Sequence, residues 1–237
     1  MNKHAASVKN FELLTSDYIS GIEKELLQEK WGGVLKTISL KKLFSYPVPE
    51  FLLFLLIGKY GFNETVCNAI FSSNRTGAEF LAPGFRLVLD RDELVLFNLN
   101  SIHDANIYLI DQFTHSLKLM PGIFDMKKVV WSSADAVQVP DDFRNKETVY
   151  LDASKLKLPL SIRRWKDGDS FHPLGMKGSK LISDFLTDEK LPVAEKELVY
   201  LLLSENEIVW VLGQRLDEKY RITSSTLEAW KCTYLIN

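Results

Sequence analysis

The chain has 237 residues, 46% of them hydrophobic and 25% charged, with a formal net charge of −2 at pH 7. This composition excludes disordered and fibrous proteins, and the absence of net positive charge excludes a globally basic DNA-binding module, so any nucleic-acid contact must be local. Cys67 and Cys232 form neither a disulfide framework nor a metal-binding pair, which indicates a reducing compartment. No apolar run exceeds seven residues, so we expect a cytoplasmic protein without a membrane segment.

The N-terminal third reads as helical. Apolar residues recur every three to four positions over 4–31, which predicts an amphipathic helix that stops at Gly32 and Gly33. Three further short helices are predicted over 37–44, 49–58 and 63–73. None of these four helices is long enough to be stable alone, so we expect them to pack on one another.

From Gly77 the pattern changes to apolar runs separated by turn residues, which predicts strands rather than helices. One short helix interrupts them, with Leu181, Ile182, Phe185 and Leu186 on a single face. The predicted strands are 79–82, 85–89, 93–97, 107–110, 128–131, 148–151, 160–164, 198–203, 207–212, 220–223 and 227–236.

These elements predict an α+β fold with three parts. A helical N-terminal domain ending in a β-meander covers 1–100, and a β-rich connecting region covers 101–158. A small α+β domain, 159–237, completes the chain.

The sequence Gly-Met-Lys-Gly-Ser-Lys at 175–180 stands directly before the short helix. Its glycines let the backbone approach an anion, the N–H groups of a helix start favour negative charge, and its two lysines add positive charge. The pattern therefore predicts a phosphate-binding loop, although the spacing is not that of a Walker A motif. The alternative is a simple turn whose serine caps the helix. The residues predicted to supply the loop backbone are Gly175, Gly178 and Ser179.

Positive charge is concentrated around this loop. Residues 163–180 hold five basic and two acidic side chains, whereas 181–237 hold six basic and ten acidic ones. Trp165, Phe171 and His172 lie beside the loop and would stack on exposed RNA bases if they are on the surface. The alternative assigns these aromatic residues to the core next to a turn.

Catalytic and metal-binding patterns are weak. The histidines lack metal-ligand spacing, and there is neither a serine-nucleophile motif nor a dinucleotide-binding loop. We therefore predict no catalytic residue and no metal ligand in this chain. A hydrolase using the neighbouring Asp169 and His172 serves only as a contrasting hypothesis.

An ordered series of motifs covers almost all of 150–237. The series is Leu160-Ser-Ile-Arg-Arg-Trp-Lys-Asp-Gly-Asp-Ser-Phe-His-Pro-Leu-Gly-Met-Lys-Gly-Ser-Lys-Leu-Ile-Ser-Asp-Phe-Leu186, Lys190-Leu-Pro192, Val209-Trp-Val-Leu-Gly-Gln-Arg-Leu-Asp217, Tyr220-Arg-Ile-Thr223 and Thr226. With this series the stretch resembles the C-terminal domain of the bacterial tRNA(Ile)-lysidine synthase family. The segment from Gly77 to Leu96, and the helical part before it, are similar to the family's middle region.

The resemblance implies a parent enzyme that is an ATP-dependent ligase. Such an enzyme adenylates the C2 oxygen of the wobble cytidine of an isoleucine tRNA, and the ε-amine of free lysine then displaces AMP to form lysidine. In the family this chemistry, with ATP and Mg²⁺, belongs to an N-terminal domain with an S-G-G-x-D-S loop. That motif is absent from these residues. We therefore expect a tRNA-holding portion that has no cofactor of its own, meets ATP and lysine only through the missing domain, and is inactive alone.

The matching motifs also imply which residues contact RNA. The chain departs from the family at Lys180 and Leu181, where two basic residues are usual, and at Lys196, where arginine is usual and lysine offers no bidentate fork. The predicted RNA contacts are Arg163, Arg164, Lys177, Lys180, Arg215 and Arg221.

Two alternatives stand beside this assignment. Arg215 would merely form a surface pair with Asp217, and Arg221 would be a solvated strand residue. At the level of function, the apolar helices around 49–73 favour a structural or homodimerisation module without RNA contact.

Overall fold

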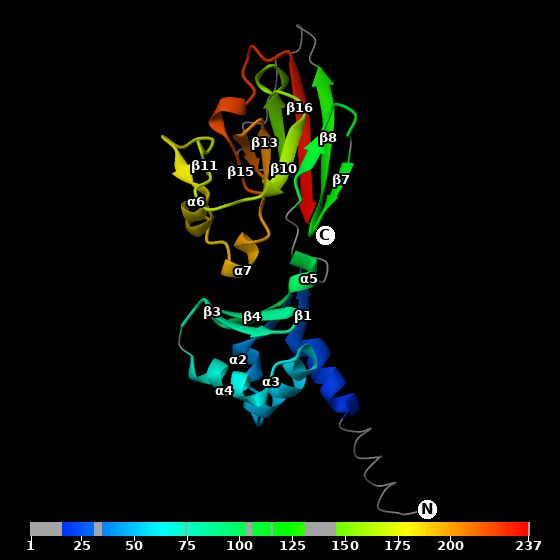
Figure 1. Ribbon diagram of the computed structural model, residues 1–237, viewed down its shortest axis with the longest axis vertical. Helices are drawn as coiled ribbons and strands as arrows, with labels where there is room; N and C mark the ends of the chain where they lie inside the picture. Colours follow the sequence, from blue (N-terminus) through cyan, green and yellow to red (C-terminus); the bar gives the residue numbers. More distant parts are fainter. Residues whose placement is uncertain are drawn as a thin grey trace, which may run out of the picture. The chain divides into compact units, whose positions relative to one another are not determined.

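The computed structural model describes residues 16–30, 35–73, 75–102, 106–114, 116–130 and 146–236. The chain divides into two compact units, Met1–Ile102 and His103–Asn237 (Figure 1). Within the described ranges, no helix combines the length and apolar character needed to span a membrane.

The first unit packs its helices against one face of a five-stranded antiparallel sheet of order β1-β2-β5-β4-β3. Leu53 and Ile57 from the helices share one core with Ile38, Leu87 and Leu94 from the sheet, and all five side chains are fully buried. The strands are β1 (Leu27–Lys30), β2 (Leu35–Ser39), β3 (Ala78–Ala82), β4 (Phe85–Asp90) and β5 (Glu93–Asn98). The helices are 16–26, α2 (Leu40–Leu43), α3 (Pro49–Ile57), the 3₁₀ turn η1 (Gly58–Tyr60), α4 (Glu64–Ser72) and α5 (Leu99–Ile102).

The sequence predicted too much helix in this unit. The first helix ends at residue 26, and β1 follows it, paired antiparallel with β2 so that Leu27 lies opposite Ile38. This pairing buries both side chains in the core that a continued helix was expected to reach, and the β-branched Thr37 and Ile38 favour a strand over the predicted helix. Residues 4–15 and the predicted stop at Gly32 and Gly33 lie outside the described residues. Helices α3 and α4 and the meander β3-β4-β5 are confirmed.

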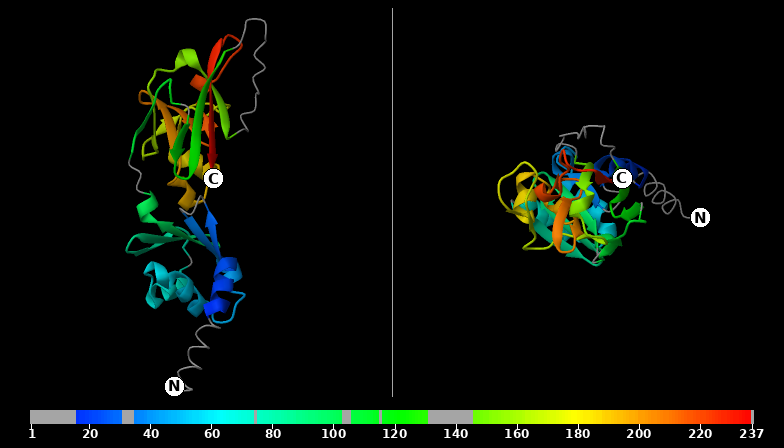
Figure 2. Two further views of the ribbon diagram at one scale, coloured as in Figure 1. Left: turned by 90° about the vertical axis from the view of Figure 1, so that its right-hand side faces the viewer. Right: turned by 90° about the horizontal axis from the view of Figure 1, so that it is seen from above.

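The second unit is a β-sandwich with a helical layer on one side. A five-stranded sheet, β15-β14-β13-β10-β6, faces a four-stranded sheet, β7-β8-β16-β9, and a two-stranded ladder joins β11 to β12 (Figure 2). The strands are β6 (Tyr108–Ile110), β7 (Ser116–Leu119), β8 (Gly122–Val130), β9 (Thr148–Asp152), β10 (Leu160–Arg164), β11 (Ser170–Phe171), β12 (Lys180–Leu181), β13 (Tyr200–Ser204), β14 (Glu207–Val211), β15 (Arg215–Leu216) and β16 (Glu228–Ile236). The helices are α6 (Ile182–Asp188), α7 (Val193–Lys196) and the 3₁₀ turns η2 (Ala153–Lys155) and η3 (Glu218–Tyr220).

Two apolar clusters hold the layers of this unit together. Between the sheets, the rings of Phe124 and Trp210 lie 6.5 Å apart and are both buried. On the other face of the five-stranded sheet, Phe185 of α6 packs with Leu201 and Val211. No described element covers the outer face of the four-stranded sheet.

The strands in the described part of 101–158 belong to these sheets. Strand β6 pairs with β10, and β8 and β9 flank β16 on its two sides. The predicted separate connecting region over 101–158 is therefore replaced by strands of the second unit, because local patterns do not show which strands become neighbours. The strand expected over 220–223 is absent. Instead Asp217 starts a 3₁₀ turn, and Arg221 makes a single bridge to Leu151.

Candidate nucleic-acid interface

The glycine loop connects the two short strands β11 and β12. Gly175 and Gly178 adopt φ of +81° and +83°, the left-handed conformation that L side chains rarely take, and residues 175–179 are exposed. Phe171 is buried at the base of the loop, in an edge-to-face contact with Phe185 at 5.1 Å. The core alternative for Phe171 is therefore confirmed.

Two backbone N–H groups, at the start of the loop and at the start of α6, already have acceptors within the unit. The N–H of Gly175 donates to a carboxylate oxygen of Glu218 at 3.1 Å. The first helical N–H, that of Ile182, donates to the carbonyl of Asp169 at 2.8 Å. An anion at Gly175 would have to displace an acidic side chain, which disfavours phosphate binding at this residue.

Ser179 is not the helix cap. Residues 180 and 181 form strand β12, and α6 begins only at Ile182, with Leu181 in the cap position and no side-chain hydrogen bond to the helix. Leu181 is 44% exposed and does not belong to the buried face of the helix, contrary to the prediction. Ile182, Phe185 and Leu186 are buried as predicted.

Arg163 is paired inside the unit. Its two terminal nitrogens lie 2.8 Å from the two carboxylate oxygens of Asp169, in a bidentate pair with side chains only 18% and 15% exposed. Asp169 also accepts the N–H of Lys166 at 2.7 Å. Partial burial disfavours its charged form, but these hydrogen bonds outweigh that cost and hold the pKa of Asp169 below its usual range.

Arg164 has a structural environment as well. Its guanidinium donates to the carbonyls of Leu198 and, at 2.7 Å, of Met120. It also lies 3.7 Å from the ring centre of Tyr200, which is fully buried. The side chain thus connects three segments that are far apart in the sequence, and all its described contacts are internal.

Three further candidates have acidic partners. Lys180 pairs with Asp188, and Arg221 pairs through Nε with Glu218 at 2.9 Å. Arg215 lies 3.0 Å from Glu189, not beside Asp217 as the alternative proposed.

Glu189 joins two cations and fixes the end of α6. It accepts from Lys146 at 2.7 Å as well as from Arg215. Partial burial disfavours the charged carboxylate, yet the two cations hold the pKa of Glu189 below its usual range. Four of the six predicted RNA contacts, Arg163, Lys180, Arg215 and Arg221, therefore have an acidic partner in the same unit, which the charge count in the sequence could not show.

Lys177 is different from the other candidates. It lies on the exposed tip of the loop and makes no hydrogen bond or ion pair with any described residue. Arg221 is the second candidate with access to solvent, because its side chain is 53% exposed despite its contact with Glu218.

The contrasting hydrolase hypothesis receives no geometric support. Asp169 is engaged by Arg163, and the acidic group nearest the His172 imidazole is Asp217, whose Oδ2 lies 3.9 Å from Nδ1 and accepts the backbone N–H of His172 at 2.7 Å. Trp165 donates its indole N–H to the carbonyl of Lys196 at 2.6 Å and packs on the core of α6. This contact favours the core alternative for Trp165, and only His172 of the three aromatic residues is exposed.

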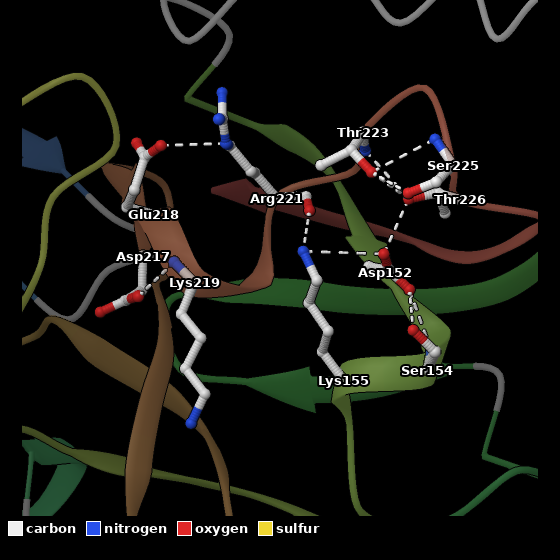
Figure 3. A network of polar contacts seen from close by, with 10 residues as sticks. All are labelled: Asp152, Ser154, Lys155, Asp217, Glu218, Lys219, Arg221, Thr223, Ser225 and Thr226. Atoms are coloured by element: carbon white, nitrogen blue, oxygen red, sulfur yellow. Dashed lines mark hydrogen bonds and ion pairs between the residues drawn. The ribbon is translucent and has the colours of Figure 1, made fainter.

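A network around Asp152 fixes the backbone beneath Arg221 (Figure 3). The buried carboxylate of Asp152 accepts from Thr226 at 2.7 Å and from Ser154 at 2.6 Å. Lys155 donates to the carbonyl of Arg221 at 2.8 Å, while the guanidinium of Arg221 extends away toward Glu218. Sequence reasoning did not identify Asp152, although Thr226, its partner, belongs to the motif series.

Comparison with known proteins gives the family. The protein-family model described as "TilS substrate binding domain" matches residues 32–99, and the protein-family model described as "TilS substrate C-terminal domain" matches residues 160–231. The tRNA(Ile)-lysidine synthase of Parabacteroides distasonis is 36% identical over 191 residues, which cover 80% of this chain and 42% of that protein. The chain belongs to the tRNA(Ile)-lysidine synthase family. The resemblance stated from the motif series is thereby confirmed.

The chain is also similar to a second curated protein and, weakly, to a solved structure. The tRNA(Ile)-lysidine synthase of Bacteroides thetaiotaomicron is 28% identical over 227 residues, 93% of this chain and 49% of that protein. A solved structure titled "Crystal structure of TILS C-terminal domain" is 17% identical with a TM-score of 0.44, and the match covers 55% of this chain and 98% of that one. The chain spans less than half the length of the two curated relatives.

Proposed function

We propose that this chain recognises and positions the tRNA substrate of a tRNA(Ile)-lysidine synthase, an isoleucine tRNA with a wobble cytidine. The observation that carries the proposal is the pair of substrate-domain matches, one on each compact unit of the chain. The ligase chemistry, with ATP, Mg²⁺ and free lysine, belongs in this proposal to a separate catalytic domain, and the 237 residues alone form no lysidine.

The glycine loop is not suited to the phosphates of ATP. The carboxylate of Glu218 occupies the N–H of Gly175, where a phosphate oxygen would have to bind. Arg163, Lys180 and Arg215 form ion pairs with carboxylates of the same unit. No step of the reaction is therefore assigned to this loop.

Lys177 and Arg221 remain as proposed RNA contacts of the C-terminal unit. Lys177 is exposed without a described partner, and Arg221 is half exposed above a backbone fixed by Lys155. Contacts of this kind neutralise phosphates and release the counterions bound there, so their contribution to affinity falls as the salt concentration rises.

We expect the wild-type chain to bind a wobble-cytidine isoleucine tRNA, with affinity falling steeply between about 50 and 200 mM salt. Lys177→Glu should weaken binding about three- to tenfold and reduce the salt slope by about one. Filter binding at several salt concentrations measures both quantities. Lys190→Glu makes the same charge change at another exposed lysine and serves as the matched control. Salt-insensitive or undetectable binding by the wild type would overturn the proposed function.

A second candidate function, homodimerisation through the first unit, is favoured by one feature. An apolar recess of about 200 Å³ is lined by residues that include Tyr18, Val48 and Phe51, and these three side chains are 65%, 66% and 56% exposed. If this surface binds a second copy, sedimentation equilibrium should show a dimer that Phe51→Lys converts to a monomer. A wild-type monomer at high concentration would eliminate this candidate.

A further inference from the structure

The outer face of the four-stranded sheet carries a group of lysines that the motif series did not single out. Lys127 of β8 and Lys231 of β16 are directly opposite each other in the antiparallel register, and Tyr150 of β9 is opposite Lys231. Directly opposite residues have side chains on the same face. The alternate residues Phe124, Met126 and Cys232 point into the core and are buried, so the lysines point outward.

The position of Lys127 directly opposite Lys231 lowers the stability of the fold, so stability does not explain why both lysines are present. Like charges directly opposite each other across a strand pair destabilise a sheet. Neither lysine makes an ion pair with a described residue, whereas the neighbouring Lys128 pairs with Glu228 at 2.9 Å. The fold therefore holds two cations together with one carboxylate, Asp125, in the same recess, and the described residues show no ion pair between that carboxylate and either lysine.

The surroundings of this pair suit a phosphate and the sugar attached to it. A recess of about 370 Å³ is lined by Asp125, Met126, Lys127, Lys231 and Thr233. The ammonium of Lys231 lies 5.7 Å from the ring centre of Tyr150, which positions the charge over an aromatic surface.

Charge on this face is predominantly positive. Lys118 of β7 is opposite Ile123, so its side chain lies on the same face as Lys127 and Lys231. Among the paired strand residues that solvent reaches on this face, the acidic one is Asp125, which is half-buried. In the left view of Figure 2 the sheet lies in front of the five-stranded sheet, and no described element covers it.

We propose that the face defined by Lys118, Lys127, Lys231 and Tyr150 is a second contact surface for the phosphodiester backbone of the tRNA. The inference rests on the proposed function, which supplies a polyanion as the occupant. Figure 1 shows β8 and the β11 side of the glycine loop on opposite sides of the unit. One straight duplex cannot lie against both sides, so this face and Lys177 contact different parts of the tRNA.

Lys127→Glu separates a role in binding from a role in folding. The change turns a repulsive cross-strand pair with Lys231 into an attractive one, so the melting temperature should stay the same or rise. Affinity of the full chain for the tRNA should fall on the order of tenfold, and the salt slope should fall by about one to two. Lys190→Glu, with the same change in net charge, should leave both the affinity and the slope at their wild-type values.

The outcomes of this test are distinguishable. If the wild type binds tRNA with salt sensitivity but Lys127→Glu binds equally well, this inference is overturned and the proposed function stands. If the wild type shows no salt-sensitive binding, the proposed function fails and this inference fails with it. If a polyglutamate peptide binds as tightly as the tRNA and Lys127→Glu abolishes that binding, RNA is the wrong occupant.

Discussion

Arg164→Ala is expected to destabilise the C-terminal unit by about 2–4 kcal/mol. The substitution removes the donors that Leu198 and Met120 accept from, and it removes the cation stacked on Tyr200. The carbonyl of the buried Leu198, which loses a charged donor, accounts for most of this loss. The missing aliphatic stem and the lost cation–π contact account for the rest.

Urea unfolding followed by circular dichroism measures this effect. Arg164→Lys keeps the charge but not the planar fork, so we expect an intermediate loss, and Lys177→Ala should remain within about 0.5 kcal/mol of wild type. A variant Arg164→Ala that unfolds like the wild type but binds tRNA poorly would contradict the structural assignment. It would restore Arg164 as the RNA contact that the sequence predicted.

Asp169→Asn is expected to lower stability at pH 7 by about 2–3 kcal/mol. Asparagine has the same shape, but it cannot accept two hydrogen bonds from Arg163 while also holding the N–H of Lys166. The half-buried guanidinium then keeps its charge without a counter-charge.

The same pair predicts a pH dependence with a definite sign. Because the pKa of Asp169 is lowered in the folded state, its contribution is complete above the unfolded value of about 3.9 and is lost as pH falls through the lower folded value. The difference in unfolding free energy between wild type and Asp169→Asn should therefore be constant near neutral pH and shrink below about pH 4. A difference that grows on acidification would contradict the ion pair.

The sequence predicted family, fold class and many strands because those depend on local patterns and ordered motifs. It did not predict the use of each basic residue, because the partners lie far away along the chain. Arg215 and Glu189 are separated by 26 positions, and Arg164 and Met120 by 44. Only the packing of the sheets brings such pairs together.

The sheet face was missed for the same reason. Lys127 and Lys231 lie on strands that no local signal joins, and their register becomes visible only once β8 and β16 are paired. The first unit shows the converse error. Residues 27–30 continue a helical apolar pattern, but pairing with β2 satisfies the same apolar side chains in a sheet.

The central claim is that RNA contacts lie at basic side chains that solvent can reach, not at those that the fold holds in largely buried pairs. Amine-reactive labelling of the wild-type chain, with and without the wobble-cytidine tRNA, reads all lysines at once by mass spectrometry. We predict that the tRNA protects Lys127, Lys177 and Lys231 and leaves Lys190 fully reactive. Equal labelling of all four lysines with and without tRNA would contradict the account.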